Sequence, residues 1–563
     1  PAPSGHGPVP QVDPRALDLL REDLADYTVD TLADVLGPLS QAALTRDHTL
    51  PAARWATGLL ASDGRSTVET ALAAGEARAA VQEALRADGS REHDETALAA
   101  LVACFMLARP VRRRALDRAL PRLGVSGAQR LGLVTAAGAA PDDEVRPAVD
   151  LQPYAATDAR GTAHWWVASD LAAQAGGGPL PTDHVLGVGG ASLMLAGVTM
   201  RRPVGRVLDL GTGCGVQALH AARHARHVTG TDLSARALAF AGFTWALNGP
   251  LVDGVGLDLR RGSLLEPVAG QRFDLVVSNP PFVITPRGPG VPRYDYRDGG
   301  EVGDALVRNL VTGVGEVLAP GGVAQLLGNW EHRRGEPWQE RVGAWLDASG
   351  LDGWVVQREV QDPAEYAETW IRDGGQAEGS RFDELYAAWL DDFEARGVDA
   401  VGFGVITLRR PGLSAAGDAQ EPGRVTLRRV EEVRHPVSGP LGGHLEACLA
   451  AHDWLESAGA GEAGLAAARL RVAQDVTEER HHRPGEADPQ VILLRQGGGF
   501  GRSVQASTAL AGLVGACDGE LTVGRLIGAL AGLLEVPACD LAAELLPAVR
   551  RLVADGFLLP VED

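Results

Sequence analysis

Short apolar segments alternate with longer amphipathic segments between about residues 186 and 412. The stretches 217–225 and 235–247 carry apolar residues at helical spacing, and the apolar segments around them have the length of buried strands. The predicted strands are 206–210, 228–232, 257–260, 275–278, 322–327 and 404–409. This alternation predicts an α/β fold built on a parallel, doubly wound sheet.

The first 185 residues follow a mainly helical pattern instead. Apolar residues recur at helical spacing in 95–107, 111–120 and 126–131, and the pair 132–136 and 144–149 fits a small hairpin. Three short helices followed by a hairpin resemble a winged helix. The basic residues of the middle helix are Arg112, Arg113, Arg114, Arg118 and Arg122. Such a helix can contact phosphates, but the acidic residues around it favour an ordinary solvated face. We expect a strand at 163–168 and a glycine-rich linker at 176–179.

The part that follows the predicted sheet begins with a linker rich in Gly, Ala and Pro at 413–423. Strands are expected at 425–430, 470–476, 490–495 and 557–559, and helices at 507–517, 522–534 and 539–555. Helices followed by a terminal strand suggest a second winged-helix-like module. It has no basic helix, so a protein-contact or scaffold role is favoured. The predicted domains are therefore 1–185, 186–412 and 424–563.

The composition agrees with several packed units. A chain of 563 residues is too long for one core, and an apolar content of 45% indicates a globular protein. The net charge of −21 disfavours unaided binding to bare nucleic acid. The chain has no lysine, which fits a GC-rich genome, so its arginine-only basic residues are not an indication of phosphate recognition.

Other composition features exclude some classes of protein. The five cysteines never occur at C-x-x-C spacing, which argues against a disulfide framework or a cysteine metal site. No apolar run is long enough to predict a membrane span, and residues 1–10 lack the pattern of a secretory signal. We therefore expect a cytoplasmic protein with no metal and no membrane partner.

A glycine-rich turn follows the first strand of the predicted sheet. Asp209 is near the strand end, and the turn runs Gly211-Thr212-Gly213-Cys214-Gly215. Glycines allow a tight turn and a close approach to a ligand, and the amides at the next helix favour an anionic group. Val216 stands where a dinucleotide-binding fingerprint needs glycine. Asp232 ends the second strand, where a carboxylate suits the two hydroxyls of a ribose.

A second motif, Asn279-Pro280-Pro281-Phe282, follows the fourth strand. Open α/β sheets bind ligands at this carboxyl edge, and the two prolines restrict the turn. The side-chain oxygen of Asn279 and the carbonyl of Pro280 can both accept hydrogens from one NH2 group. Phe282 can stack on the flat group that carries this nitrogen. The motif therefore predicts chemistry at a planar nitrogen, for which Asn279, Pro280 and Phe282 are the candidate catalytic residues.

Together the two motifs resemble those of class I S-adenosylmethionine (SAM)-dependent methyltransferases. The second motif is similar to the [N/D]PP[Y/F] motif of amino-methyltransferases, which include HemK-like protein glutamine methyltransferases and enzymes that methylate exocyclic amines of adenine or guanine. The resemblance covers about residues 186–410. It implies a Rossmann-like, seven-stranded sheet between the two winged-helix-like domains, with SAM as cofactor. The residues implied to bind SAM are Asp209, Gly211, Thr212, Gly213, Gly215, Asp232, Leu233, Ser263, Leu264 and Asn279. Many relatives have Asp where Ser263 stands.

The acceptor is less well defined by the sequence. The long loop 283–304 follows the second motif, and the candidate substrate-binding residues are Pro281, Tyr294, Tyr296 and Arg297. Gly299-Gly300 and Gly303-Asp304 resemble the matching stretch of HemK-like enzymes, which favours a glutamine side chain in a protein. Phe282 and the basic helix favour the alternative, an exocyclic amine of adenine or guanine in RNA or DNA.

Three further hypotheses remain open at the sequence level. A small-molecule or peptide acceptor is compatible with the motifs. A SAM-binding protein without catalysis is also compatible, although the intact Asn279 argues against it. Trp330, Glu331 and Trp338, which follow the fifth strand, either line the acceptor side or belong to the core.

Overall fold

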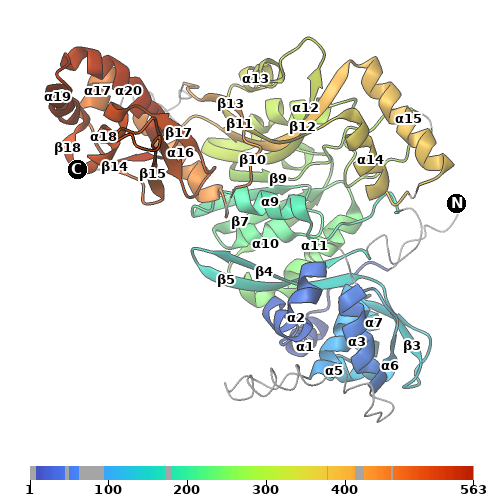
Figure 1. Ribbon diagram of the computed structural model, residues 1–563. Coiled ribbons are helices and arrows are strands. Elements are labelled where there is room, and N and C mark those ends of the chain that lie inside the picture. Colours follow the sequence, from blue (N-terminus) through green and yellow to red (C-terminus); the bar gives the residue numbers. More distant parts are fainter. Residues whose placement is uncertain are drawn as a thin grey trace, which may run out of the picture.

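The computed structural model describes most of the chain. The described residues are 8–44, 50–62, 94–171, 180–288, 290–376, 378–412, 424–437, 439–457 and 461–561. The linkers expected at 176–179 and 413–423 lie outside them. Figure 1 shows the N-terminal segment in blue, the central sheet in green and yellow, and the C-terminal segment in red at the far side of the sheet.

The central sheet has eight strands in the order β13-β11-β12-β10-β9-β6-β7-β8. Their bounds are β6 (Val204–Leu210), β7 (Ala225–Asp232), β8 (Gly256–Arg261), β9 (Phe273–Ser278), β10 (Leu318–Arg333), β11 (Asp352–Gln361), β12 (Val398–Arg409) and β13 (Arg428–Glu432). β8, β7, β6, β9 and β10 pair in parallel, and β12 runs antiparallel to both β10 and β11. The strand order reverses between β6 and β9, which is where such sheets bind ligands.

This architecture confirms the predicted Rossmann-like sheet, but it has eight strands where seven were expected. Six of the eight had been located in the sequence. β11 was not predicted. The strand expected at 425–430 was assigned to the C-terminal domain, but β13 pairs in parallel with β11 at the edge of the central sheet. That assignment was wrong because β-pairing between distant segments leaves no local pattern in the sequence.

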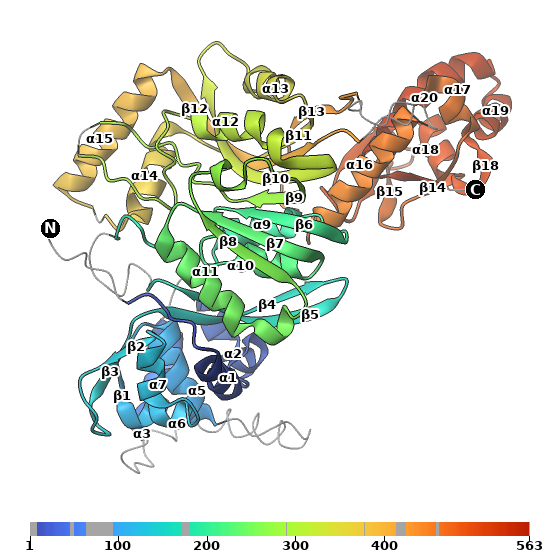
Figure 2. The ribbon, with the colours of Figure 1, turned by 180° about the vertical axis from the view of Figure 1, so that it is seen from behind.

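Helices connect and cover the strands. They are α9 (Gly190–Val198), α10 (Val216–Ala222), α11 (Ala235–Leu247), α12 (Ala305–Gly313), α13 (Trp338–Ser349), α14 (Pro363–Asp373) and α15 (Ser380–Ala395). α14 begins where Asp362 accepts the amide hydrogen of Glu365 and Pro363 takes the first helical position. α14 and α15 form a helical insertion between β11 and β12, and Figure 2 shows them at the end of the sheet away from the C-terminal segment.

The N-terminal segment packs helices on two small antiparallel sheets. Its helices are α1 (Pro14–Asp23), α2 (Val29–Leu44), α3 (Leu50–Ser62), α5 (Glu95–Leu101), a π-helical turn (Val102–Met106), α6 (Arg113–Ala119) and α7 (Gly124–Arg130). β1 (Val111–Arg112), β2 (Val134–Ala136) and β3 (Glu144–Pro147) form one sheet in the order β1-β3-β2. The helix expected at 111–120 begins later than predicted because its first two residues pair with β3.

A hairpin joins this segment to the central sheet. It consists of β4 (Asp150–Asp158) and β5 (Gly161–Ser169). The Tyr154 hydroxyl lies 2.8 Å from Nε2 of His220 on α10, and Asp158 accepts two hydrogen bonds of 2.5 and 2.6 Å from Arg223. These contacts fix α10, the helix that follows the glycine-rich turn, against the N-terminal segment.

The C-terminal segment contains α16 (Gly442–Glu456) and α17 (Gly461–Ala467) followed by two small sheets and three helices. The sheets have the orders β18-β14-β19 and β15-β16-β17. Their strands are β14 (Arg469–Val472), β15 (Val476–His481), β16 (Val491–Gln496), β17 (Ser503–Ala506), β18 (Asp518–Thr522) and β19 (Leu558–Pro560). The helices are α18 (Thr508–Gly515), α19 (Val523–Leu534) and α20 (Ala538–Ala554).

Candidate active site

The glycine-rich turn leaves β6 and leads into α10. Gly211, Gly213 and Gly215 have φ values of 76°, 54° and 85°, a region that other residues rarely adopt. A Cβ on Gly215 would lie 3.0 Å from Cα of Ala241 on α11, so a side chain has no room there. The turn therefore requires glycine at 215 for both conformation and space.

Two carboxylates hold this turn. Asp209 is 1% exposed, and its Oδ2 accepts a 2.6 Å hydrogen bond from the Thr212 hydroxyl. Burial, with a contribution from the nearby Asp232, raises the pKa of Asp209 to about 7. Asp232 accepts hydrogen bonds from the Gly213 amide (3.0 Å) and the Ser234 amide (2.9 Å), and burial raises its pKa as well. The two acids thus fix the backbone around the position predicted for the cofactor.

The ends of the neighbouring strands meet at the same edge. The amides of Gly211 and Thr212 both donate to the Thr231 carbonyl at 2.9 Å, and the Gly262 amide donates to the Asp232 carbonyl at 3.0 Å. The latter bond brings the turn that carries Ser263 and Leu264 next to β7. Ser263 is exposed, and Leu264 has a φ of 44°. Leu233, which is also predicted to bind SAM, is 57% exposed.

The Asn279-Pro280-Pro281-Phe282 motif lies beside the glycine-rich turn. The Ser278 hydroxyl donates to the Leu210 carbonyl at 2.7 Å, which ties the end of β9 to the end of β6. A Cβ on Gly211 would lie 3.9 Å from the Asn279 carbonyl oxygen. Oδ1 of Asn279 is buried and has no hydrogen-bond partner within the described residues. A buried carbonyl oxygen without a partner is costly, so this atom is available to accept a hydrogen bond from a bound molecule.

Phe282 and Pro280 have protein contacts of their own. The Phe282 amide donates to the Pro280 carbonyl at 2.7 Å, which leaves the second lone pair of that oxygen available to accept another hydrogen. The Phe282 ring is 9% exposed and packs on Phe403 of β12, with the ring centroids 5.4 Å apart. Stacking of Phe282 on an acceptor stays a prediction.

The loop 283–304 is folded against α14 by three of its predicted substrate-binding residues. Tyr294 and Arg297 are 3% and 6% exposed, and the Tyr294 hydroxyl donates to the Gly374 carbonyl at 3.1 Å. Arg297 donates to the Trp370 carbonyl and to Asp373, both at 2.6 Å, and Asp373 also accepts from the Tyr296 hydroxyl at 2.9 Å. The expectation that Tyr294 and Arg297 clamp the acceptor directly does not fit these contacts, because their polar groups are used to anchor the loop.

Comparison with known families finds a match in the central segment. Residues 188–337 match the family model described as Methyltransferase small domain. Over these residues the chain is similar to that family. Two further models, each described as a domain of unknown function, match residues 65–148 (DUF7059) and 446–560 (DUF7782).

Individual relatives agree with this assignment. A ribosomal protein uL3 glutamine methyltransferase of Bradyrhizobium diazoefficiens is 34% identical over 200 residues, which are 32% of this chain and 59% of that protein. A release factor glutamine methyltransferase of Geobacter sulfurreducens is 39% identical over 125 residues, 21% of this chain and 42% of the relative. A ribosomal RNA small subunit methyltransferase C of Alcanivorax borkumensis is 34% identical over 145 residues, 25% of this chain and 38% of the relative. The chain therefore spans roughly half the length of these curated relatives.

Solved structures similar to the chain include other methyltransferases. A geranyl diphosphate C-methyltransferase from Streptomyces coelicolor is 16% identical, with a TM-score of 0.24 and coverage of 39% of this chain and 77% of that one. A ribosomal protein L11 methylase from Lactobacillus delbrueckii is 19% identical, with a TM-score of 0.21 and coverage of 39% and 80%.

Two residues near the Asn279-Pro280-Pro281-Phe282 motif were not predicted from the sequence. Asn329 on β10 is 1% exposed and its Nδ2 donates to the Tyr366 hydroxyl at 2.5 Å. The same hydroxyl accepts the Ile284 amide hydrogen at 3.0 Å. A polar residue within the apolar run of β10 was the available signal for Asn329. Nothing in the sequence pointed to Tyr366, which lies in the helical insertion.

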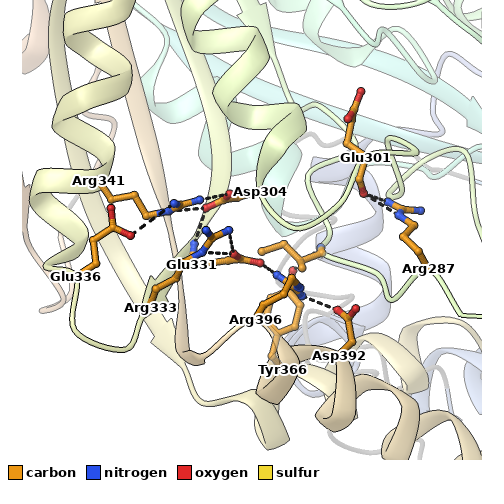
Figure 3. Close-up of polar contacts among 11 residues, drawn as sticks. Arg287, Glu301, Asp304, Glu331, Arg333, Glu336, Arg341, Tyr366, Asp392 and Arg396 are labelled. Carbon is orange, nitrogen blue, oxygen red and sulfur yellow. Dashed lines mark hydrogen bonds and ion pairs between the residues drawn. The ribbon is translucent and has the colours of Figure 1, made fainter.

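The residues after the fifth strand belong to the core. Trp330 and Glu331 are completely buried, and Trp338 is 8% exposed, with the two indole rings stacked at 5.8 Å. Glu331 pairs with Arg333 and Arg396, as Figure 3 shows.

Asp304 extends this charged cluster to the end of the loop 283–304. It accepts the Glu331 amide hydrogen at 2.9 Å and lies 2.5 Å from the guanidinium of Arg341. Arg287 pairs with Asp298 inside the loop. Ion pairs therefore hold both the interior of the loop and its junction with α12, and Figure 3 shows the pair at the junction.

The described residues contain no group of three or more His, Cys, Asp or Glu placed to hold a metal ion. Among the described helices, none has the length and apolar content needed to cross a membrane.

Proposed function

We propose that this chain is a SAM-dependent N-methyltransferase and that its favoured acceptor is the side-chain amide of a glutamine in a protein. The observation that carries the proposal is the buried, unpartnered Oδ1 of Asn279 beside the glycine-rich turn. An oxygen in this position suits an N–H donor that arrives with the acceptor. The glutamine methyltransferases among the relatives act on substrates of this chemical class.

The residues around the turn fit SAM. Asp232 presents carboxylate oxygens to the ribose hydroxyls, and the exposed Ser263 and Leu264 are placed for the adenine. Asp209 and Thr212 hold the turn that faces the methionine part. SAM supplies an electrophilic methyl group on a sulfonium.

The motif supplies orientation to a weak nucleophile. The lone pair of an amide nitrogen is delocalised into its carbonyl, so the nitrogen must be held with this lone pair directed at the methyl group. Asn279 Oδ1 accepts one N–H and the free lone pair of the Pro280 carbonyl accepts the other. No base is needed before transfer, because the nitrogen loses its proton only after it has gained the methyl group.

Charge favours a protein acceptor over a nucleic acid. The basic segment 112–122, of which α6 is the helical part, was the main argument for phosphate contacts, yet several of its arginines have acidic partners. Arg114 lies 3.0 Å from Asp142, and Arg122 lies 2.7 Å from Glu22. These pairs neutralise much of the helix, and the whole chain carries a net charge of −21.

The second candidate acceptor is an exocyclic amine of adenine or guanine. It is favoured by Phe282, whose ring suits a base, and by the relative named as a ribosomal RNA methyltransferase. The same two carbonyl oxygens would orient an amine of this kind.

The terminal segments fit a supporting role in this proposal. The order helix, strand, two helices and hairpin in residues 95–147 supports the predicted winged-helix-like unit, and we assign this unit to contacts with a protein partner. We place the enzyme in the cytoplasm, where ribosomal proteins and release factors, the substrates named for the relatives, are found.

The proposal is tested with purified protein and methyl-labelled SAM. Total protein, RNA and DNA from a strain that lacks the gene are offered separately. We expect label in the protein fraction that is lost on protease treatment. Label in RNA or DNA alone would show that the acceptor is a nucleobase and not a glutamine. No label in any fraction would reject both.

The Asn279→Ala variant tests the mechanism directly. It should bind SAM normally and transfer no methyl group, because one of the two N–H acceptors is gone. Asn309→Ala, on an exposed position of α12, is the matched control and should behave as the wild type. Normal turnover by Asn279→Ala would refute the mechanism.

A further inference from the structure

The helical insertion between β11 and β12 contains a buried tyrosine whose hydroxyl bonds the chain just after the second motif. The insertion spans residues 362–397 and lies outside the three family matches. Tyr366 on α14 is 2% exposed. Its ring packs among Trp370, Trp389 and Phe393, with centroid distances of 6.0, 5.9 and 5.8 Å. Aromatic packing on several sides fixes the position of its hydroxyl.

That hydroxyl connects the insertion to the motif segment. It accepts the Ile284 amide hydrogen at 3.0 Å, and Ile284 is only two residues beyond Phe282. It also accepts a hydrogen from Asn329 Nδ2 at 2.5 Å. Asn329 lies opposite Phe403 in the β10–β12 pairing, and Phe403 packs on Phe282. Tyr366 and Asn329 therefore fix the chain on both sides of the Phe282 ring.

The insertion also holds the rest of the loop 283–304. Gly374 and Asp373 bind Tyr294 and Arg297, as described above, and Arg381 on α15 donates to the Gly290 carbonyl. Arg396, just after α15, pairs with Glu331 on β10 (Figure 3). The loop 283–304 is thus supported at several points by one element, of which Tyr366 makes the contact nearest to the motif.

We propose that Tyr366, supported by Asn329, is a positioning residue for the acceptor. It fixes the Ile284 amide and thereby the direction in which Asn279 Oδ1 and the Pro280 carbonyl point. This inference rests on the proposed methyl transfer, because only that reaction needs the two oxygens aimed at one NH2 group. Tyr366 does not touch the reacting atoms, so its loss lowers turnover and leaves SAM binding intact.

The test uses Tyr366→Phe, which removes the hydroxyl and keeps the packed ring. Tyr386→Phe on α15 is the matched control, because Tyr386 stacks on Phe382 and its hydroxyl makes no hydrogen bond within the described chain. Methyl transfer from labelled SAM to the protein fraction gives kcat at saturating extract and the KM for SAM. We expect Tyr366→Phe to lower kcat about tenfold, in line with the sensitivity of catalysis to small misplacements, with the KM for SAM within about twofold. Tyr386→Phe should change neither quantity.

A second variant separates the two partners of the hydroxyl. Asn329→Leu keeps the branched shape of the side chain and the Ile284 contact but removes one hydrogen bond. It should lower kcat less than Tyr366→Phe, and the double variant should be no slower than Tyr366→Phe alone, because both changes act through the same hydroxyl. Independent, multiplying losses would overturn the proposed linkage.

Hydrogen exchange gives a readout that does not depend on activity. In Tyr366→Phe the Ile284 amide loses its acceptor, so exchange in peptides covering 283–304 should accelerate at least tenfold, while peptides of β6 and α10 stay unchanged. Unchanged exchange at Ile284, or unchanged kcat, would overturn the positioning role. If the wild type transfers methyl to no fraction, the proposed function fails, and the exchange result still decides whether Tyr366 orders the segment.

Discussion

Alanine at Gly215 should mainly lower stability, whereas alanine at Gly213 should mainly weaken SAM binding, although both glycines belong to the same turn. At Gly215 the φ of 85° is strained for any L-residue and the new Cβ would lie 3.0 Å from Cα of Ala241. The left-handed conformation costs about 1–2 kcal/mol and overpacking adds about 1–3 kcal/mol. We therefore expect Gly215→Ala to destabilise the methyltransferase domain by about 2–5 kcal/mol.

Gly213 differs because its new Cβ would enter open space. No atom lies within 4 Å of that position, and the φ is 54°. Gly213→Ala should therefore lower the stability only by the conformational cost of about 1–2 kcal/mol. Gly213 is one of the residues predicted to bind SAM, so the methyl group of Gly213→Ala should instead weaken SAM binding at least tenfold.

Hydrogen exchange is the suitable assay, because a chain of several units does not unfold in one step. The opening free energies of amides in β6 and α10 report local stability, and calorimetric titration reports SAM affinity. The reasoning is refuted if Gly213→Ala destabilises β6 and α10 as much as Gly215→Ala does. It is equally refuted if Gly213→Ala binds SAM with wild-type affinity.

Three further predictions concern buried charges. Asp232→Ala should weaken SAM binding at least tenfold in titration, and unchanged affinity would exclude the ribose contact. Burial raises the pKa of Asp209 to about 7, so protonation of this carboxyl stabilises the folded, SAM-free state. As the pH rises from 3.8, the pKa of Asp209 in the unfolded chain, through about 7, up to about 4 kcal/mol of this stability is lost. Asp209→Asn should flatten the fall in the opening free energy of β6 amides between pH 5 and 8, and an unaltered slope would contradict the assignment. Glu331→Gln should cost about 3 kcal/mol, because Arg396 loses its buried partner and keeps only Asp392, whereas the exposed Glu394→Gln should be close to neutral in the same hydrogen-exchange assay.

The sequence predicted those parts of the site that depend on local pattern. Asp209, Asp232 and Asn279 each follow an apolar strand run, and parallel strands bring such ends to one edge of a sheet. The structure indeed ties the ends of β6, β7 and β9 together through Ser278 and the amides of Gly211 and Thr212. The positions of these residues could therefore be predicted without coordinates.

Features that depend on distant segments could not be predicted in this way. Tyr366 lies 82 residues after Ile284 in the chain, and no local pattern connects the two. Tyr294 and Arg297 have the chemistry of ligand-binding residues, but a backbone carbonyl and a carboxylate on α14 occupy them. Likewise, the basic pattern of residues 112–122 could not reveal that Asp142 pairs with Arg114 and Glu22 with Arg122.

The eighth strand makes the methyltransferase domain dependent on chain beyond its own boundary. β13 covers the outer edge of β11, and Glu431 and Glu432 accept hydrogen bonds from Trp354 and Gln357 of that strand at 2.7 and 2.6 Å. A protein shortened at residue 412 would leave the backbone groups of β11 open to pairing with another molecule. The part of the chain after residue 412 therefore also protects the edge of the sheet from pairing with another copy.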